Sequence, residues 1–414
     1  MNQYPISEIV DEIKNALNLH TTLILQAPPG AGKSTILPLE LLKADWLGDK
    51  KIILLEPRRM AARSVAHRMA DLLEEQVGKT VGYRVRFDQR ISAQTRIEVV
   101  TEGILTRRLQ QDNTLEGVGI VIFDEFHERS LHSDLSLALC RDLQQILRED
   151  LRILIMSATL DGEQLSSILD NAPIITSKGR QYPIDVRYTA IDNKAPITGQ
   201  ITSVISKTLK EETGDILVFL PGVREIQQTA EALTERYSDI AIRPLYGELS
   251  LTVQQDAIKP DVQQRRKVVL ATSIAETSLT IEGIHIVIDS GLARVPKFDP
   301  NSGMTKLDTV KVTQDAADQR AGRAGRLGPG IAIRLWSEAT HNYLKPQRVP
   351  EIMEADLAPL VLELAQWGVK NIQSMTWVTP PPLGSVEQAK SLLHELHALK
   401  NDVITEEGKA LAHL

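Results

Sequence analysis

The sequence has little cysteine, few aromatic residues and no long apolar run. Its one cysteine, Cys140, excludes an intrachain disulfide framework and is typical of a reducing compartment. No apolar run approaches the ~18 residues that span a bilayer, and the N-terminus lacks the charged-then-apolar pattern of a signal peptide. We therefore expect a cytoplasmic protein that has no membrane partner.

Basic residues are fewer than acidic ones, 47 against 54. The net charge of −7 over 414 residues excludes nucleic-acid binding that is driven by the charge of the whole chain. Nucleic acid would have to be bound by local groups, and each candidate group could equally be a solvated surface. The candidates are Arg58, Arg59, Arg63 and Arg68; Arg84, Arg86, Arg90 and Arg96; and Arg265, Arg266 and Lys267.

Apolar runs alternate with helical patterns in two successive blocks. Continuous apolar runs bounded by polar turns are typical of parallel strands that are covered by helices on both faces. We therefore expect an α/β fold with two parallel-sheet domains and a smaller helical unit after them. The expected strands cover residues 23–26, 52–55, 97–100, 120–123 and 153–156 in the first block, and 216–219, 242–245, 268–270, 284–288 and 331–335 in the second.

The expected domain boundaries follow from changes in composition. The domains cover residues 1–176, 177–345 and 346–414, with a polar linker at 177–196 and a β-hairpin at about 292–312. Because the last domain stops without a closing polar tail, we expect the chain to be a fragment of a longer protein.

Residues 27–35, Ala-Pro-Pro-Gly-Ala-Gly-Lys-Ser-Thr, follow an apolar strand. This pattern predicts a strand, a phosphate loop and a helix that runs from residue 33 through residue 42. Gly30 and Gly32 would let backbone N–H groups close around phosphate oxygens, Lys33 would reach the β- and γ-phosphates, and the Ser34 hydroxyl would bind Mg²⁺. Ala27 stands where the simple pattern has glycine, and an ordinary turn before a helix stays open as the alternative.

Two carboxylates follow the apolar run at 120–123. Asp124 is the candidate that holds Mg²⁺ through its water shell, and Glu125, next to the metal, is the candidate general base for the attacking water. His127 and His132 superficially resemble a zinc motif, but they are five residues apart instead of four, which argues against zinc.

The segment Gln-Arg-Ala-Gly-Arg-Ala-Gly-Arg at 319–326 is rich in arginine. On a helix, Gln319, Arg323 and Arg326 would share one face, from which arginines stabilise charge on a transferring phosphoryl group. The alternative is a basic surface helix. The two glycines inside it would cost about 1 kcal/mol each relative to alanine, which favours a segment shaped for close approach.

Taken together, the motifs resemble those of superfamily 2 helicases, most closely the DEAH-box RNA helicases of the bacterial HrpB type. The resemblance covers essentially residues 1–414, and it implies two tandem RecA-like domains followed by a partial winged-helix domain. It rests on residues 27–35, 57–59, 101–103, 124–127, 157–159, 217–222, 271–281 and 319–326, which occur in the order and approximate spacing of that family.

The resemblance implies an enzyme that hydrolyses ATP with Mg²⁺ between two RecA-like lobes and moves 3′-to-5′ on single-stranded RNA. A DNA helicase or translocase, and a nucleotide-switched nucleic-acid-binding scaffold, stay open as alternatives. Protein partners are not indicated. Phe126 stands where the family has a small residue, and Ile258 stands where it usually has the aromatic that stacks on the nucleotide base.

The resemblance also implies roles for single residues. It assigns the phosphates and Mg²⁺ to Gly30, Ala31, Gly32, Lys33, Ser34 and Thr35. It assigns the activation of water to Glu125 with Gln319, and the role of arginine fingers to Arg323 and Arg326. It assigns the nucleotide base to Arg68, the ribose to Thr280 and Glu282, and the nucleic-acid backbone to Arg58, Arg59, Thr101, Gly222 and Thr272.

Overall fold

The computed structural model describes residues 4–28, 30–158, 161–179, 182–190, 192, 195–276, 281–299, 302–326 and 328–412. The chain forms two compact units. The first unit contains residues 1–179, 297–306 and 349–414, and the second unit contains residues 180–296 and 307–348.

The first unit is built on an eight-stranded sheet with the order β4-β3-β5-β2-β6-β7-β1-β8. Neighbouring strands are parallel except for β4, which runs antiparallel to β3. The five strands that the sequence predicts for the first block are confirmed. The bounds are β1 (Thr22–Gln26), β2 (Lys51–Glu56), β3 (Val81–Val85), β4 (Asp88–Arg90), β5 (Ile97–Thr101), β6 (Val118–Phe123), β7 (Arg152–Ser157) and β8 (Ile174–Thr176).

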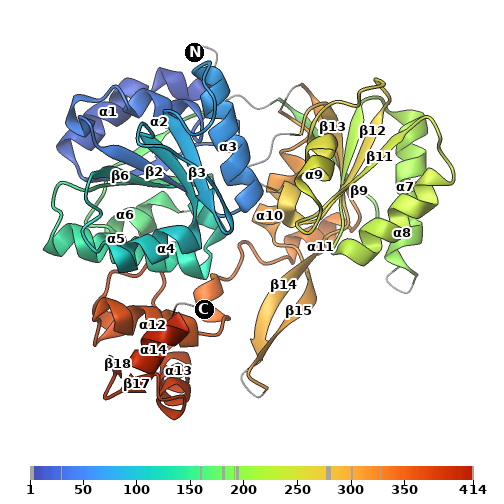
Figure 1. Ribbon diagram of the computed structural model, residues 1–414. Helices are drawn as coiled ribbons and strands as arrows, with labels where there is room; N and C mark the ends of the chain where they lie inside the picture. Colours follow the sequence, from blue (N-terminus) through green and yellow to red (C-terminus); the bar gives the residue numbers. More distant parts are fainter. Residues whose placement is uncertain are drawn as a thin grey trace. The chain divides into compact units, whose positions relative to one another are not determined.

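Helices cover both faces of this sheet (Figure 1). Successive residues of one strand therefore enter opposite cores, as Leu23 and Ile24 do, which explains why the strands are continuously apolar. One face carries η1 (Pro5–Glu8), α1 (Val10–Leu19), α2 (Ile36–Leu41), η2 (Asp45–Leu47) and α3 (Arg59–Leu72), and the other carries α4 (Glu102–Gln111), η3 (Phe126–Glu128), α5 (Leu131–Ile146) and α6 (Gly162–Ile168).

The helix after the phosphate loop is shorter than the sequence predicts. It begins at Ile36 instead of Lys33 and ends at Leu41. Pro38 has no N–H group to donate to the carbonyl of Ser34, so the first turn cannot start at residue 33 in the regular way. The Gly32 carbonyl instead accepts N–H groups from residues 35, 36 and 37, at 3.3, 2.8 and 3.3 Å.

The second unit is built on a six-stranded parallel sheet with the order β11-β12-β10-β13-β16-β9. Its predicted strands are confirmed, but the sequence missed β9, which lies inside the segment predicted as a linker. This edge strand is mostly exposed, so it lacks the apolar run that marks the other strands. The strands are β9 (Ile184–Tyr188), β10 (Asp215–Phe219), β11 (Ala241–Leu245), β12 (Lys267–Ala271), β13 (Ile284–Asp289) and β16 (Gly330–Arg334).

The predicted β-hairpin is also confirmed, as a two-stranded ribbon separate from both large sheets. Its strands are β14 (Leu292–Asp299) and β15 (Met304–Lys311). The helices of the second unit are α7 (Ile197–Glu211), α8 (Val223–Thr234), α9 (Leu251–Ile258), η4 (Ser273–Ala275), α10 (Gln314–Ala321) and α11 (Glu338–Asn342).

The C-terminal region packs against the α4 and α5 side of the first unit and shares its hydrophobic core (Figure 1). Trp367 Nε1 donates to Asp142 Oδ2 at 2.8 Å, and the Arg129 carbonyl accepts the Glu351 N–H at 3.0 Å. Arg129 Nη2 also donates to Thr379 Oγ1 at 2.9 Å. The elements are η5 (Glu351–Met353), α12 (Ala358–Trp367), η6 (Ile372–Ser374), α13 (Leu383–Glu395), β17 (Leu399–Lys400), β18 (Val403–Ile404) and α14 (Glu406–Ala412).

Within the described ranges, no helix combines the length and the apolar character that a membrane span requires.

Candidate active site

The phosphate loop connects β1 to α2. Gly30 and Gly32 have φ of 83° and 91°, a backbone region that glycine adopts without strain. A Cβ on Gly32 would lie 3.1 Å from both Ile6 Cγ2 and Tyr4 Cβ, so the loop also needs a small residue here. Ala27, the departure from the glycine pattern, is buried at the end of β1.

Lys33 of this loop lies against the two predicted carboxylates. Its Nζ is 2.8 Å from Glu125 Oε1 and 3.5 Å from Asp124 Oδ1, and all three side chains are almost fully buried. Burial by itself would lower the pKa of Lys33, but the charges of Glu125 and Asp124 outweigh it and raise the pKa above its ordinary value. The structure thus brings together three residues that the sequence singled out, and Lys33 is charged.

The turn after β6 orients Glu125. Glu125 has φ 49° in the left-handed region, and its N–H donates to Asp124 Oδ1 at 2.8 Å. His127 Nε2 lies 3.5 Å from Glu125 Oε2, and Phe126 packs edge-on against Phe123 with ring centres 6.0 Å apart. The unusual Phe126 therefore fills the core beneath the turn and leaves both carboxylates in place.

Glu56 is a buried carboxylate that the sequence reasoning missed. It ends β2, whose Leu55 pairs with Phe123, so it lies beside Asp124. Neither of its carboxylate oxygens accepts a hydrogen bond from the described residues. Burial and the neighbouring Asp124 raise the pKa of Glu56 well above its ordinary value. The signal that marked Asp124, an acidic residue directly after an apolar run, also marks Glu56.

The donor set fits Mg²⁺. Asp124 Oδ2 is buried and accepts no hydrogen bond from the part of the chain that the structure describes. Carboxylate and hydroxyl oxygens, here from Asp124, Glu125 and Ser34, are the ligands that Mg²⁺ prefers, and it usually completes its shell with water and substrate phosphates. The described residues contain no cluster of three or more histidine, cysteine or acidic side chains that would hold a metal alone.

The arginine segment of the second unit is not one helix. Helix α10 ends at Ala321, so Gln319 lies on it while Arg323 and Arg326 lie in the turns that follow. The prediction of a shared helical face is therefore wrong. A Cβ on Gly325 would lie 2.8 Å from Ile184 Cγ1 and 2.9 Å from the Tyr182 carbonyl oxygen, so the chain needs a glycine where it passes close to residues 182 and 184.

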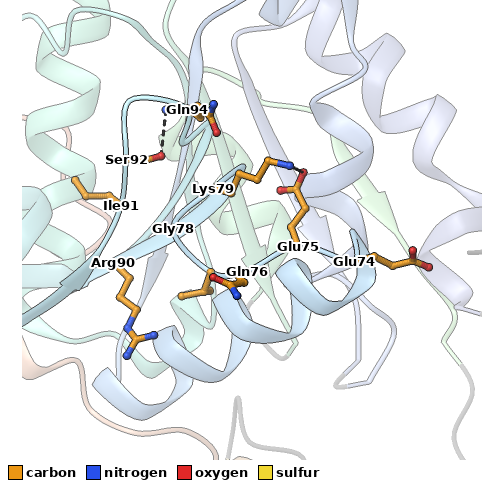
Figure 2. A pocket seen from close by; sticks show the side chains of 10 residues that line it. Glu74, Glu75, Gln76, Gly78, Lys79, Arg90, Ile91, Ser92 and Gln94 are labelled. Atoms are coloured by element: carbon orange, nitrogen blue, oxygen red, sulfur yellow. Dashed lines mark hydrogen bonds and ion pairs between the residues drawn. The ribbon is translucent and has the colours of Figure 1, made fainter.

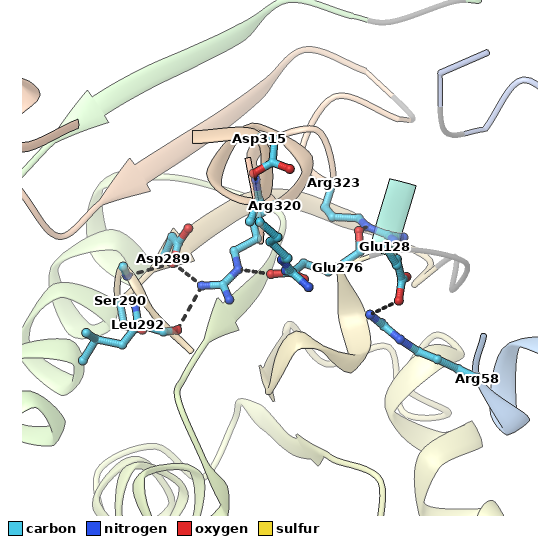
Figure 3. Close-up of polar contacts among 12 residues, drawn as sticks. Arg58, Glu128, Glu276, Asp289, Ser290, Leu292, Asp315, Arg320 and Arg323 are labelled. Carbon is cyan, nitrogen blue, oxygen red and sulfur yellow. Dashed lines mark hydrogen bonds and ion pairs between the residues drawn. The ribbon is translucent and has the colours of Figure 1, made fainter. Parts of the chain in front are cut away.

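A buried ion-pair group fixes this segment (Figure 3). Arg320 is fully buried and donates to Glu276 Oε1 and Asp289 Oδ1, both at 2.7 Å. Arg323 Nε donates to the Glu276 carbonyl at 2.9 Å, and Arg348 pairs with the Glu276 carboxylate. The sequence reasoning missed the supporting roles of these partners, because their spacing along the chain carries no signal.

The remaining predicted residues lie on several elements. Arg68 is exposed on α3 and donates to the Tyr4 hydroxyl at 3.2 Å, and Arg58 pairs with Glu128 at 3.2 Å. Arg59 is exposed at the start of α3, and Thr101 precedes α4. In the second unit, Thr272 follows β12, Glu282 is exposed, and a Cβ on Gly222 would lie 2.7 Å from Arg294 Cζ. Thr280 lies outside the described residues.

A hollow of about 640 Å³ lies beside the end of α3 and the turn between β4 and β5 (Figure 2). Lys79 and Glu75 on its wall pair with each other at 3.1 Å. Its lining includes Arg90, one of the candidate nucleic-acid-binding arginines, but no residue of the phosphate loop and neither Asp124 nor Glu125, so it is separate from the phosphate loop.

Comparison with known proteins identifies two domains. Residues 8–168 match the DEAD/DEAH box helicase domain, and residues 199–328 match the helicase conserved C-terminal domain. The chain is 48% identical to the ATP-dependent RNA helicase HrpB of Escherichia coli, covering 100% of this chain and 51% of the relative. It is 37% identical to the HrpA homolog of Haemophilus influenzae, covering 99% and 32%.

The structure agrees with these relationships. A crystal structure of the E. coli DEAH/RHA helicase HrpB matches 99% of this chain and 52% of its own length, with a TM-score of 0.94. The chain thus spans about half the length of HrpB and a smaller share of the HrpA homolog. The tandem parallel-sheet fold, the two matching domains and these relatives together show that the chain belongs to the DEAD/DEAH box helicase family.

Proposed function

We propose that this chain hydrolyses ATP and couples the hydrolysis to 3′-to-5′ movement along single-stranded RNA. The observation that carries the proposal is the buried group of Lys33, Asp124 and Glu125, which lies at the carboxyl ends of β1 and β6 on either side of β7. The names of the relatives, ATP-dependent RNA helicases, support ATP as the nucleotide and RNA as the track. The direction of movement rests on the family resemblance.

The proposed chemistry begins with an exchange of partners at Lys33. When a triphosphate enters the loop, the ammonium group turns from Glu125 to the phosphate oxygens, which frees the Glu125 carboxylate to accept a proton from the attacking water. Ser34 and Asp124, with Glu125 close by, would hold Mg²⁺, which when bound neutralises phosphate charge. Gln319 would orient the water.

Further roles are proposed residue by residue. Arg323 and Arg326 would stabilise charge on the transferring phosphoryl group. Backbone N–H groups of residues 30–35 would bind the phosphates, Arg68 the base, and Thr280 and Glu282 the ribose. The nucleic-acid backbone is assigned to Arg58, Arg59, Thr101, Gly222 and Thr272. We assign nucleotide binding to residues 1–176, the second helicase domain to 177–345 and a partial winged helix to 346–414, in a protein of the cytoplasm.

The proposal is tested by steady-state ATP hydrolysis with single-stranded RNA, with single-stranded DNA and with neither. RNA should stimulate turnover strongly and DNA weakly, and Lys33→Ala serves as the inactive reference. Glu125→Gln should lower turnover by about 10²- to 10⁴-fold, because a general base contributes that much. Equal stimulation by DNA would favour a DNA translocase, and turnover indifferent to both would favour a nucleotide-switched scaffold.

The direction of movement is tested with single strands of RNA that carry a tightly bound blocking protein at one end only. We expect ATP-dependent displacement of a tightly bound blocking protein from the 5′ end of a strand loaded at its 3′ side. Displacement from the 3′ end alone would contradict the proposed direction.

A further inference from the structure

The side chain of Lys267 lies in the interior of the second unit. Lys267 begins β12 and is 0% exposed, so it cannot belong to the basic surface that the sequence suggests for residues 265–267. A buried charge is costly unless it is paired or hydrogen-bonded. Within the described ranges the Lys267 ammonium group forms hydrogen bonds but no ion pair with a carboxylate, which is unusual for a buried lysine.

Main-chain carbonyl oxygens surround this ammonium group. An ammonium group has three N–H donors, so the four oxygens around it share them. Carbonyl oxygens gathered around one positive charge resemble the shell that such oxygens form around a potassium ion. The oxygens belong to Ala257, Ile258, Lys259 and Glu282, and they lie 3.2, 3.4, 2.8 and 3.2 Å from Lys267 Nζ.

Three of these carbonyls belong to the C-terminal end of α9. The last carbonyls of a helix lack N–H partners within the helix and carry the negative end of its dipole, so a cation is favourable there. Pro260, directly after these residues, has no N–H group and cannot continue the helix. Lys267 therefore caps α9 from the neighbouring strand.

The fourth carbonyl connects a second segment to the same helix end. The Glu282 N–H donates to the Ile258 carbonyl at 3.1 Å, and the Glu282 carbonyl accepts from Lys267. The Lys267 N–H in turn donates to Asp215 Oδ1 of β10 at 2.8 Å. The backbone of residue 282 is thus held from both sides, whereas Glu282 itself is exposed and available to a ligand.

We propose that Lys267 is a positioning residue for nucleotide binding, whose ammonium group serves as a built-in cation that ties residue 282 to the end of α9 and so places the Glu282 carboxylate at the ribose. Because Lys267 is buried, it acts through Glu282 and does not touch the nucleotide. This inference rests on the proposed function, since it takes Glu282 as a residue that binds the ribose.

The test compares the binding of ADP and of pyrophosphate to the 414-residue chain, measured by isothermal titration calorimetry with Mg²⁺ present. Lys267→Met keeps the length of the side chain but removes its N–H donors. It should bind ADP about tenfold more weakly, because a hydrogen bond to a charged group contributes that much. Pyrophosphate has neither base nor ribose and should bind as it does to the parent. Unchanged ADP affinity, or equal losses for both ligands, would overturn the inference.

The matched control is Arg266→Met. The Arg266 guanidinium also binds main-chain carbonyls of the second unit, those of Gly214 at 2.6 Å and Leu209 at 2.9 Å. These carbonyls lie away from α9 and residue 282 in the sequence and have no proposed role in nucleotide binding, so the ADP affinity should stay at the parent value. Circular dichroism should show the helix content of the parent in both variants at the assay temperature.

A second cycle of variants shows whether Lys267 acts through Glu282. Glu282→Ala should weaken ADP binding by itself. Adding Lys267→Met should weaken it little further, because the carboxylate that Lys267 positions is already absent. Additive losses would overturn the positioning role.

The role of the positive charge is tested with Lys267→Ala, which removes the ammonium group from the four carbonyls. Ammonium chloride should restore the ADP affinity of this variant, because a free ammonium ion can donate N–H groups to the same oxygens. Sodium chloride at the same concentration should not restore it. An ADP affinity that is equally low in both salts would overturn the role of the ammonium group as a built-in cation.

Failure of this inference can be told from failure of the proposed function. If Glu282→Ala weakens ADP binding while Lys267→Met does not, only the role of Lys267 is wrong. If Glu282→Ala binds ADP as tightly as the parent chain, the ribose contact and this inference are both wrong, while ATP hydrolysis stays supported. If the parent chain binds neither ADP nor ATP, the proposed function is wrong as well.

Discussion

At the scale of single residues, Lys33 is a structural cation in addition to the catalytic role proposed for it. It balances Asp124 and Glu125 in an interior that excludes water. Lys33→Met should lower the free energy of unfolding by about 3–5 kcal/mol, the range for removing one partner of a buried ion pair. Urea denaturation followed by tryptophan fluorescence would measure the loss.

A double-mutant cycle isolates the interaction energy between Lys33 and Glu125. Adding Glu125→Gln to Lys33→Met should recover part of the lost stability, because one of the unbalanced carboxylates is removed. The control is Lys14→Met, which breaks a partly exposed ion pair with Glu40 and should change stability by less than about 1 kcal/mol. Strictly additive losses in the cycle would contradict the coupling.

Glu102 should give the first unit a pH-dependent stability. Burial, together with the carboxylates of Glu128 and Glu351, raises the pKa of Glu102 from 4.5 to about 7 in spite of a hydrogen bond with Ser130. The folded chain then binds this proton more tightly than the unfolded chain does. The stabilisation that protonation of Glu102 gives the folded state is complete below pH 4.5, and it is lost as the pH rises to about 7.

The variant Glu102→Gln should lose this dependence. Relative to the parent, its free energy of unfolding should rise by about 2 kcal/mol between about pH 5 and about pH 7.5. Urea denaturation at both pH values provides the measurement, with Glu395→Gln at an exposed position as the control. A difference that does not vary with pH would contradict the assignment.

The sequence reveals the charged residues of the candidate site, but not the ion pairs that hold the neighbouring segments in position. Lys33, Asp124 and Glu125 are each marked by the apolar strand that precedes them, which is a local signal. Arg320 is 44 residues from Glu276, and only the folded sheet brings the two together. Pairings of this kind depend on topology, so no short pattern reveals them.

At the scale of elements, the segment after α10 depends on Arg320 for its position. Arg320→Lys keeps the charge but cannot reproduce the forked contact with Glu276 and Asp289. We expect it to lower the kcat of ATP hydrolysis about tenfold or more while changing ATP affinity less, because it displaces Arg323.

The appropriate control lies in the same unit. Arg243→Lys alters a partly exposed ion pair with Asp261 and should leave kcat within about twofold of the parent value. Equal losses of kcat and ATP affinity in Arg320→Lys would indicate general destabilisation instead of misplacement of Arg323.

Elements are predictable where one physical signal dominates. The ten predicted strands of the two sheets follow from their apolar runs, but the buried strand β3 does not, because Gly82 and Arg84 interrupt its apolar residues. Strand β9 does not, because an edge strand exposed to solvent has no such run, and the start of α2 does not, because Pro38 and Gly32 override the general loop-to-helix pattern.

At the scale of the whole molecule, the C-terminal region and the first sheet domain share one hydrophobic core. We expect α5 and α12 to unfold together. Native-state hydrogen exchange should therefore give similar free energies of opening for buried amides in both helices. Earlier opening of α12 at much lower free energy would show that the region folds independently. The sequence indicates its helices but not this shared core, because helical periodicity does not reveal which surface a helix covers.

Arg129 connects the turn after β6 to the C-terminal region. It lies four residues after Glu125, its carbonyl accepts the N–H of Glu351, and its side chain donates to Thr379. One residue therefore belongs at once to the turn that carries the carboxylates and to the contact with the C-terminal region. By thermodynamic reciprocity, if nucleotide binding shifts this residue and so alters a ligand's affinity for the C-terminal region, that ligand must alter nucleotide affinity by the same factor.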